Sequence, residues 1–86
     1  MQTEQFFIVL NCVFGYEKDS DTYLFGVENK GIGVFHDKND LGEGWYANVT
    51  HPDFPEIECF GPCETKEEMA KIAIAEYQRI LTYLNS

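Results

Sequence analysis

The sequence predicts an α+β fold: an antiparallel sheet of four to five strands with one C-terminal amphipathic helix packed on one face, in the order β-β-β-β-(β)-α. The first two thirds hold short runs rich in Phe, Tyr, Val and Ile, separated by Gly, Asn and Asp. The last third instead repeats apolar residues at helical spacing. Short connections make successive strands antiparallel neighbours. With 86 residues, the chain is expected to form a single domain over 1–86.

The strand predictions follow apolar runs bounded by turn residues. Residues 5–14 (QFFIVLNCVF) are nearly all apolar and predict one strand that is covered on both faces, followed by a polar turn at 15–21. A loop is expected at 37–44, and Pro52 and Pro55 interrupt regular structure because proline lacks an N–H donor. The other strands are expected at 22–28, 31–36 and 45–51, with a short edge strand at 56–60.

A capping box marks the start of the helix. Thr65 is the expected N-cap, and Glu68 follows three residues later. The helix is expected to run to about Leu84, with its apolar residues spaced by three and four. One helix cannot cover a whole sheet, and both alternating sets of residues in 5–14 are apolar. The second face therefore needs a cover: the loop at 52–60, a second copy of the chain, or a partner.

Charge and missing motifs exclude several functions. Fifteen acidic residues against six basic ones give a net charge of −9, which disfavours direct binding to nucleic acids or anionic membranes. No apolar run is long enough to span a bilayer, and the first residues lack the basic region of a secretory signal. We therefore expect a cytoplasmic protein, in the host cytoplasm if a phage encodes it. No nucleotide-binding or serine-nucleophile motif occurs, so no enzyme and no catalytic residue are predicted.

Cysteine and histidine spacing does not favour a metal site. Cys59 and Cys63 form a loose C-x3-C pair, and His36 and His51 are scattered. Structural zinc sites usually combine two tight ligand pairs. We predict no metal and no cofactor, with a zinc site or a Cys–His catalytic pair as the minority reading. Cys12 is expected to be a small buried hydrophobe.

The acidic residues between 37 and 68 outnumber two lysines by nine to two, which suggests docking on a basic partner. The net charge density of the whole protein surface falls well below that of duplex DNA, so we expect electrostatic steering combined with an aromatic contact. Trp45 and Tyr46 point to opposite sides of their strand, and Tyr46 is predicted to be the exposed anchor. The predicted partner-binding residues are Asp37, Asp40, Glu43, Tyr46, Asp53, Glu56 and Glu58.

Small size, acidity and a β-rich body with one helix resemble the anti-CRISPR proteins of phages and mobile elements. Residues 26–33, with Gly44-Trp45-Tyr46 and Thr50-His51-Pro52, look like the strand-turn-strand core of a small inhibitor of type I CRISPR surveillance complexes. The resemblance implies non-enzymatic inhibition by blocking a basic nucleic-acid-binding surface. The expected partner is then a basic protein or nucleoprotein complex, such as a CRISPR effector. The alternative is a small homodimeric structural or regulatory module whose acidity serves only solubility.

Overall fold

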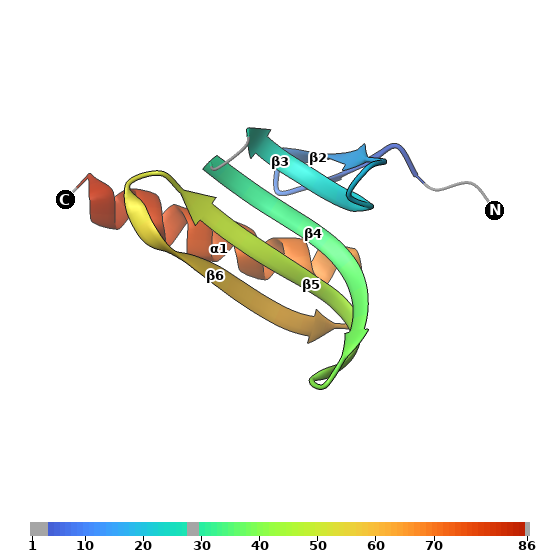
Figure 1. Cartoon of the computed structure of the whole chain (residues 1–86). Helices are drawn as coiled ribbons and strands as arrows, with labels where there is room; N and C mark the ends of the chain where they lie inside the picture. Colours follow the sequence, from blue (N-terminus) through green and yellow to red (C-terminus); the bar gives the residue numbers. More distant parts are fainter. Residues whose placement is uncertain (1–3, 28–29, 86) are drawn as a thin grey trace.

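The computed structural model describes residues 4–27 and 30–85, apart from the side chains of Pro55 and Glu56. Within these residues, six strands form one antiparallel sheet in chain order, and one helix follows (Figure 1). The α+β class is confirmed, with more strands than expected. The elements are β1 (Phe6–Val9), β2 (Cys12–Glu17), β3 (Thr22–Val27), β4 (Lys30–Asn39), β5 (Gly42–His51), β6 (Phe54–Cys63) and α1 (Lys66–Leu84).

The single strand expected over 5–14 is wrong, because a hairpin divides it. Strand β1 ends at Val9, which pairs with Cys12 at the start of β2. Leu10 and Asn11 connect them with φ values of 51° and 67°. Two left-handed residues suit a two-residue hairpin, since their twist matches that of the flanking strands. The sequence does not indicate this hairpin, because the turn residue Leu10 is apolar and continues the apolar run of β1.

The expected loop at 37–44 is also wrong, because β4 and β5 continue through it to a tight turn at Asp40 and Leu41. Gly42 follows with φ 121°, a conformation that side chains rarely adopt. Strand β6 likewise extends well beyond the predicted 56–60. Its two prolines are tolerated because β6 is an edge strand, where a missing N–H need not break a ladder.

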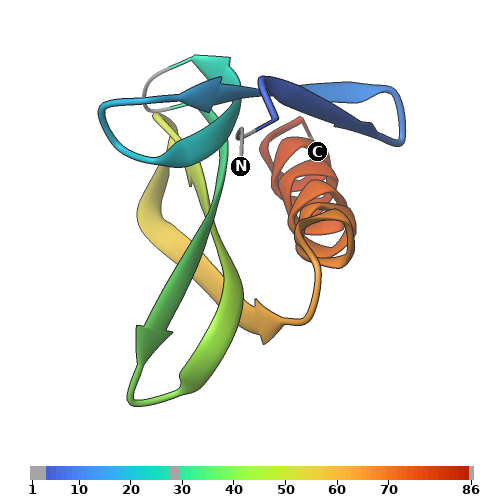
Figure 2. The same cartoon turned by 90° about the vertical axis from the view of Figure 1, so that its right-hand side faces the viewer.

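The core lies between one face of the sheet and α1. The helix packs on β4, β5 and β6 and also reaches β1, so the sheet bends around it (Figure 2). Thr65 caps the helix as predicted, and its Oγ1 accepts a hydrogen bond from the Glu68 N–H at 3.1 Å. The most deeply buried large side chains, all less than 2 % exposed, are Phe14, Met69, Ile80, Val34 and Val49.

The outer face of the sheet carries no helix among the described residues. One row of paired residues crosses the whole face without a charge: Phe6, Gly15, Leu24, Gly33, Asn48 and Cys59. A hollow of about 560 Å³ spans β3 to β5 over Gly26, Gly31 and Gly33. Residues 52–60 form a turn and an edge strand, so they do not cover this face as one alternative had it.

Candidate protein-binding surfaces

The acidic hairpin, defined as residues 37–43, projects from the body at the far end of β4 and β5 from the chain's C-terminus (Figure 1). Asp37 accepts hydrogen bonds from the Lys38 N–H at 2.8 Å and from Asn39 Nδ2 at 3.1 Å. The Leu41 N–H donates to Asn39 Oδ1 at 2.8 Å. Hydrogen bonds from Asn39 and the Lys38 backbone lower the pKa of Asp37. The turn is therefore ordered by its own polar side chains.

The prediction of Tyr46 as an exposed anchor is wrong, because its side chain is only 6 % exposed. Its ring stacks on Phe35, with the centroids 6.0 Å apart, and Gly61 lies against its edge. Its hydroxyl lies 2.6 Å from the Gly42 carbonyl oxygen and 3.1 Å from Asn39 Oδ1. Tyr46 therefore stabilises the turn of the acidic hairpin through hydrogen bonds to its residues 39 and 42.

Leu41 takes the exposed position that was expected for Tyr46. Its side chain is 74 % exposed at the hairpin tip, between Asp40 and the glycine that ends the turn. The sequence does not single out Leu41, because the pattern over 37–44 predicts a polar loop. The available signal was an isolated leucine among Asp, Asn and Gly, where burial is not expected.

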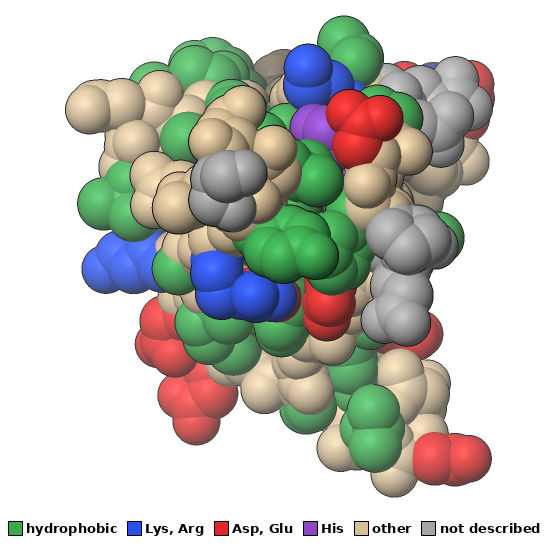
Figure 3. Space-filling model, turned by 90° about the vertical axis from the view of Figure 1, so that its left-hand side faces the viewer, with side chains coloured by type: hydrophobic (Ala, Val, Ile, Leu, Met, Phe, Trp, Pro, Cys, Tyr) green, Lys and Arg blue, Asp and Glu red, His purple; other side chains and the backbone are tan. Residues whose placement is uncertain are grey.

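The predicted acidic residues do not form one surface. Asp37, Asp40 and Glu43 share the acidic hairpin, whereas Asp53 lies in the turn at the other end of β5, about 30 Å away for a strand of this length. Glu58 lies within β6, where its charge raises the pKa of Arg79 of α1 as a minor contribution after that of Glu76. Figure 3 shows acidic side chains in separate groups on the side that it views. The side chain of Glu56 lies outside the described residues.

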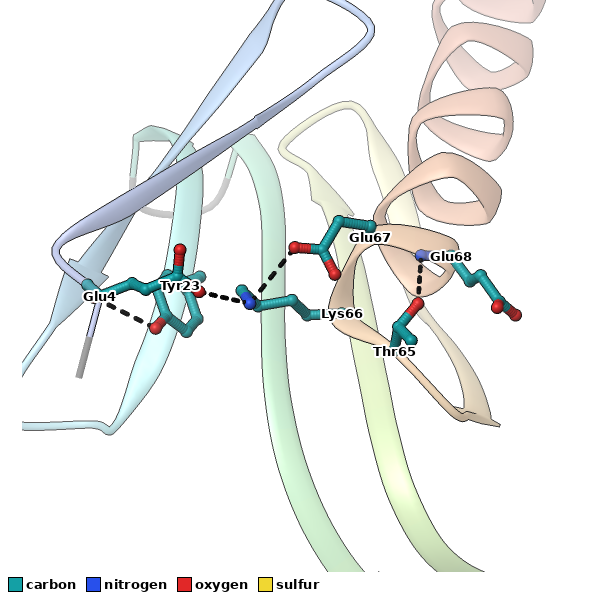
Figure 4. Close-up of polar contacts among 6 residues, drawn as sticks. All are labelled: Glu4, Tyr23, Thr65, Lys66, Glu67 and Glu68. Carbon is teal, nitrogen blue, oxygen red and sulfur yellow. Dashed lines mark hydrogen bonds and ion pairs between the residues drawn. The ribbon is translucent and has the colours of Figure 1, made fainter. Parts of the chain in front are cut away.

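A partly buried lysine connects the helix start to Phe7 of β1 and to the residue Glu4 before it, and sequence reasoning did not single it out. Lys66 Nζ lies 2.6 Å from Glu4 Oε1 and 3.2 Å from Glu67 Oε2, with its side chain 15 % exposed (Figure 4). It also sits over the rings of Phe7 and Trp45, at 5.4 and 5.8 Å from their centroids. The hydrogen bond with Glu4 is the main cause of a raised Lys66 pKa. These contacts hold the helix start against Phe7 and Trp45, so we interpret the cluster as structural.

The three cysteines have different surroundings. Cys63 packs against the core, and burial followed by the charge of Glu68 raises the pKa of its thiol, which disfavours the reactive thiolate. Cys59 is exposed on the outer face, where its Sγ donates to Asn48 Oδ1 at 3.1 Å. Cys12 is partly buried against the core. In the part of the chain that the structure describes, no group of three or more His, Cys, Asp or Glu side chains is placed to hold a metal ion.

Comparisons with protein-family models, with curated proteins and with solved structures each find no match for this chain. The anti-CRISPR resemblance therefore stays a prediction from the sequence. No helix among the described residues is long and apolar enough to cross a membrane. The geometry of the surfaces is what bears on function.

Proposed function

We propose that the chain is a non-enzymatic inhibitor that binds a basic, nucleic-acid-handling protein complex through the acidic hairpin. The observation that carries this proposal is the projecting turn, in which Leu41 is 74 % exposed and lies in the sequence between the exposed residues Asp40 and Glu43. An exposed apolar side chain at such a tip contributes little to the stability of the fold. Its burial against a partner surface would contribute favourable free energy to binding.

The internal bonds of the acidic hairpin favour binding because they fix its shape beforehand. The Tyr46 hydroxyl bonds to the Gly42 carbonyl and to Asn39, and Asn39 in turn donates to Asp37. A preorganised loop loses less conformational entropy when it binds. Its carboxylates can pair with Lys and Arg side chains that otherwise hold phosphates. Leu41 then supplies the contact that slows dissociation.

The sequence resemblance suggests a CRISPR surveillance complex as the partner, whose guide and target strands lie in positively charged channels. The test is target-DNA binding by a purified type I complex, measured with increasing amounts of this protein. The proposal expects stoichiometric inhibition that weakens as salt is raised. Full DNA binding at a large excess of the protein would reject this partner class.

Two sets of variants distinguish the effect of the acidic hairpin on binding from the effect of the protein's net charge. Replacing Asp37, Asp40 and Glu43 with Asn, Asn and Gln is expected to slow association by about tenfold. The matched control replaces Asp19, Asp53 and Glu64 with Asn, Asn and Gln, which changes the net charge equally elsewhere. Leu41→Ala is expected to speed dissociation instead. Equal effects of the two triple variants would argue against a hairpin site.

A second candidate is a homodimeric structural or regulatory module. The uncharged row across the outer face, together with the 45 % to 57 % exposure of Leu24, Phe6 and Ile8, favours it. Light scattering during size-exclusion chromatography over a range of concentrations, together with a binding assay against a basic protein, distinguishes the two. A constant mass of twice 9.9 kDa, without binding to basic proteins, would favour the module.

A further inference from the structure

Strand β1 is an edge strand whose outer side pairs with nothing in residues 4–27 and 30–85. It is short, and it consists of Phe, Phe, Ile and Val. Phe6 and Ile8 are more than half exposed on the outer face, while Phe7 and Val9 are buried on the inner face. Pairing with β2 thus fixes the position of β1 in the sheet, while its other edge has no strand partner among the described residues.

The pairing of β1 with β2 determines which of its backbone groups point outward. Val9 pairs with Cys12 next to a two-residue turn, which makes that pair hydrogen-bonded. Alternation then makes Phe7 hydrogen-bonded to β2 as well, and the Tyr16 N–H donates to the Gln5 carbonyl at 2.8 Å in the same phase. The N–H and C=O groups of Phe6 and Ile8 therefore point away from β2, towards the free edge.

This edge lacks the residues that usually protect a sheet from pairing. From Gln5 to Tyr16 the sequence has no charge and no proline. The opposite edge, β6, contains two prolines and Glu58. Charges and prolines are common protections of edge strands, and an apolar edge without them is a template for another strand.

We propose that β1 is a homodimer interface, in which a second copy adds its β1 antiparallel about a two-fold axis at Phe7. Phe6 then lies opposite Ile8 of the second copy, and the reciprocal pair follows by symmetry. Both are hydrogen-bonded pairs, so the four outward groups of each strand form four hydrogen bonds across the seam. The two Phe7 residues face each other at the closer, non-hydrogen-bonded position.

Charge placement favours a second copy over a basic partner at this edge. In the proposed register Glu4 faces Leu10 of the second copy, so no two carboxylates meet. The seam itself carries no acid to attract lysine or arginine. The acidic hairpin belongs to β4 and β5, three strands away, so each copy keeps it free. The dimer therefore does not depend on the proposed inhibitor function.

The four-residue strand makes a small interface, so the dimer should dissociate on dilution. Sedimentation equilibrium of the whole chain between about 1 µM and about 1 mM should show the mass rising from 9.9 kDa towards twice that value. Added salt should strengthen this association, because it screens two copies of charge −9. Binding of the acidic hairpin to a basic protein should respond to salt in the opposite direction, so the two proposals fail separately.

Ile8→Pro removes the outward N–H without removing a bond to β2, and it should weaken dimerisation by at least about tenfold. Ile8→Thr keeps that N–H and is the control for the side chain. Amide exchange of the unmodified chain supplies a test that needs no variant. At high concentration the amides of Phe6 and Ile8 should become protected, whereas those of Phe7 and Val9 are protected at all concentrations. A monomer at about 1 mM, or a dimer whose Phe6 and Ile8 amides exchange freely, would overturn the proposal.

Discussion

The two edges of the sheet are built differently. Strand β6 is long, contains two prolines and leads within three residues into α1. Strand β1 is short, uncharged and joined to the body by side chains: Phe7 stacks on Phe14 with the centroids 4.9 Å apart and meets Tyr23 edge-on. One edge is thus protected by its own sequence, while the other is positioned by aromatic packing and is unpaired among the residues that the structure describes.

The largest expected effect tests the packing that holds β1. Phe14 is fully buried, and Phe14→Ala should lower the free energy of unfolding by about 3–5 kcal/mol. A domain of this size has only roughly 4–13 kcal/mol in total, so the variant should be largely unfolded at moderate urea. The control on the other edge is Ile57→Ala, which removes a side chain that is 66 % exposed and should cost less than about 0.5 kcal/mol. Similar urea midpoints for the two variants would contradict the comparison.

A substitution of Lys66 tests how much its contacts between the helix start and the β1 region contribute to stability. Lys66→Ala should cost about 1–2 kcal/mol, because it removes ion pairs with Glu4 and Glu67 and two ring contacts. Thermal unfolding should show a fall of several degrees, and Lys71→Ala, on an exposed part of α1, should show almost none.

The pH dependence of this link follows from the raised Lys66 pKa, which favours the charged form in the folded state. Its contribution is complete below the ordinary value of 10.5 and is lost as pH rises through the folded value. From neutral pH upward, the melting-temperature difference between the parent and Lys66→Ala should therefore stay constant and then shrink above about pH 10.5. A difference that stays unchanged above the folded pKa would mean that packing, and not charge, dominates.

The junction of β6 with α1 should respond less strongly. Thr65→Ala removes the acceptor for the Glu68 N–H and should cost about 1 kcal/mol, or roughly 4–8 °C in melting temperature. Thr82→Ala, at an exposed position near the helix end, is the matched control. An unchanged melting curve for Thr65→Ala would show that the helix start does not depend on this cap.

The smallest effect concerns the acidic hairpin, which belongs to neither edge. The pKa of Asp37 is lowered, so its bonds to the turn are complete above the ordinary value of 3.8 and are lost as pH falls through the folded value. The Lys38 amide resonance should titrate with a midpoint below 3.8, and Asp37→Asn should abolish that transition. A midpoint at or above 3.8 would contradict the bonded turn. No global unfolding is expected, because Asp37 is exposed.

The sequence was most informative where side-chain period and local chemistry agree. The helix could be predicted closely, because Thr65 and Glu68 mark its start and apolar residues repeat along one face. The hairpin at Leu10 and Asn11 could not be predicted. Leucine rarely adopts the left-handed conformation of a turn, so an apolar residue at this position favours a continuous strand. Alternation correctly separated Trp45 from Tyr46, but it could not show that Phe35 and Gly61 enclose Tyr46.

The chain order of this fold has a consequence for its synthesis. Every strand pairs with its immediate predecessor, so the sheet can zip together as it leaves the ribosome. The helix that covers the inner face comes after all six strands that the structure describes. At a translation rate of about 5–20 residues per second, the 19 residues of α1 take roughly 1–4 s to appear. Until the helix has formed, Val34 and Val49 on β4 and β5 lack its cover, so we expect the nascent sheet to be a transient client for chaperones that bind apolar surfaces.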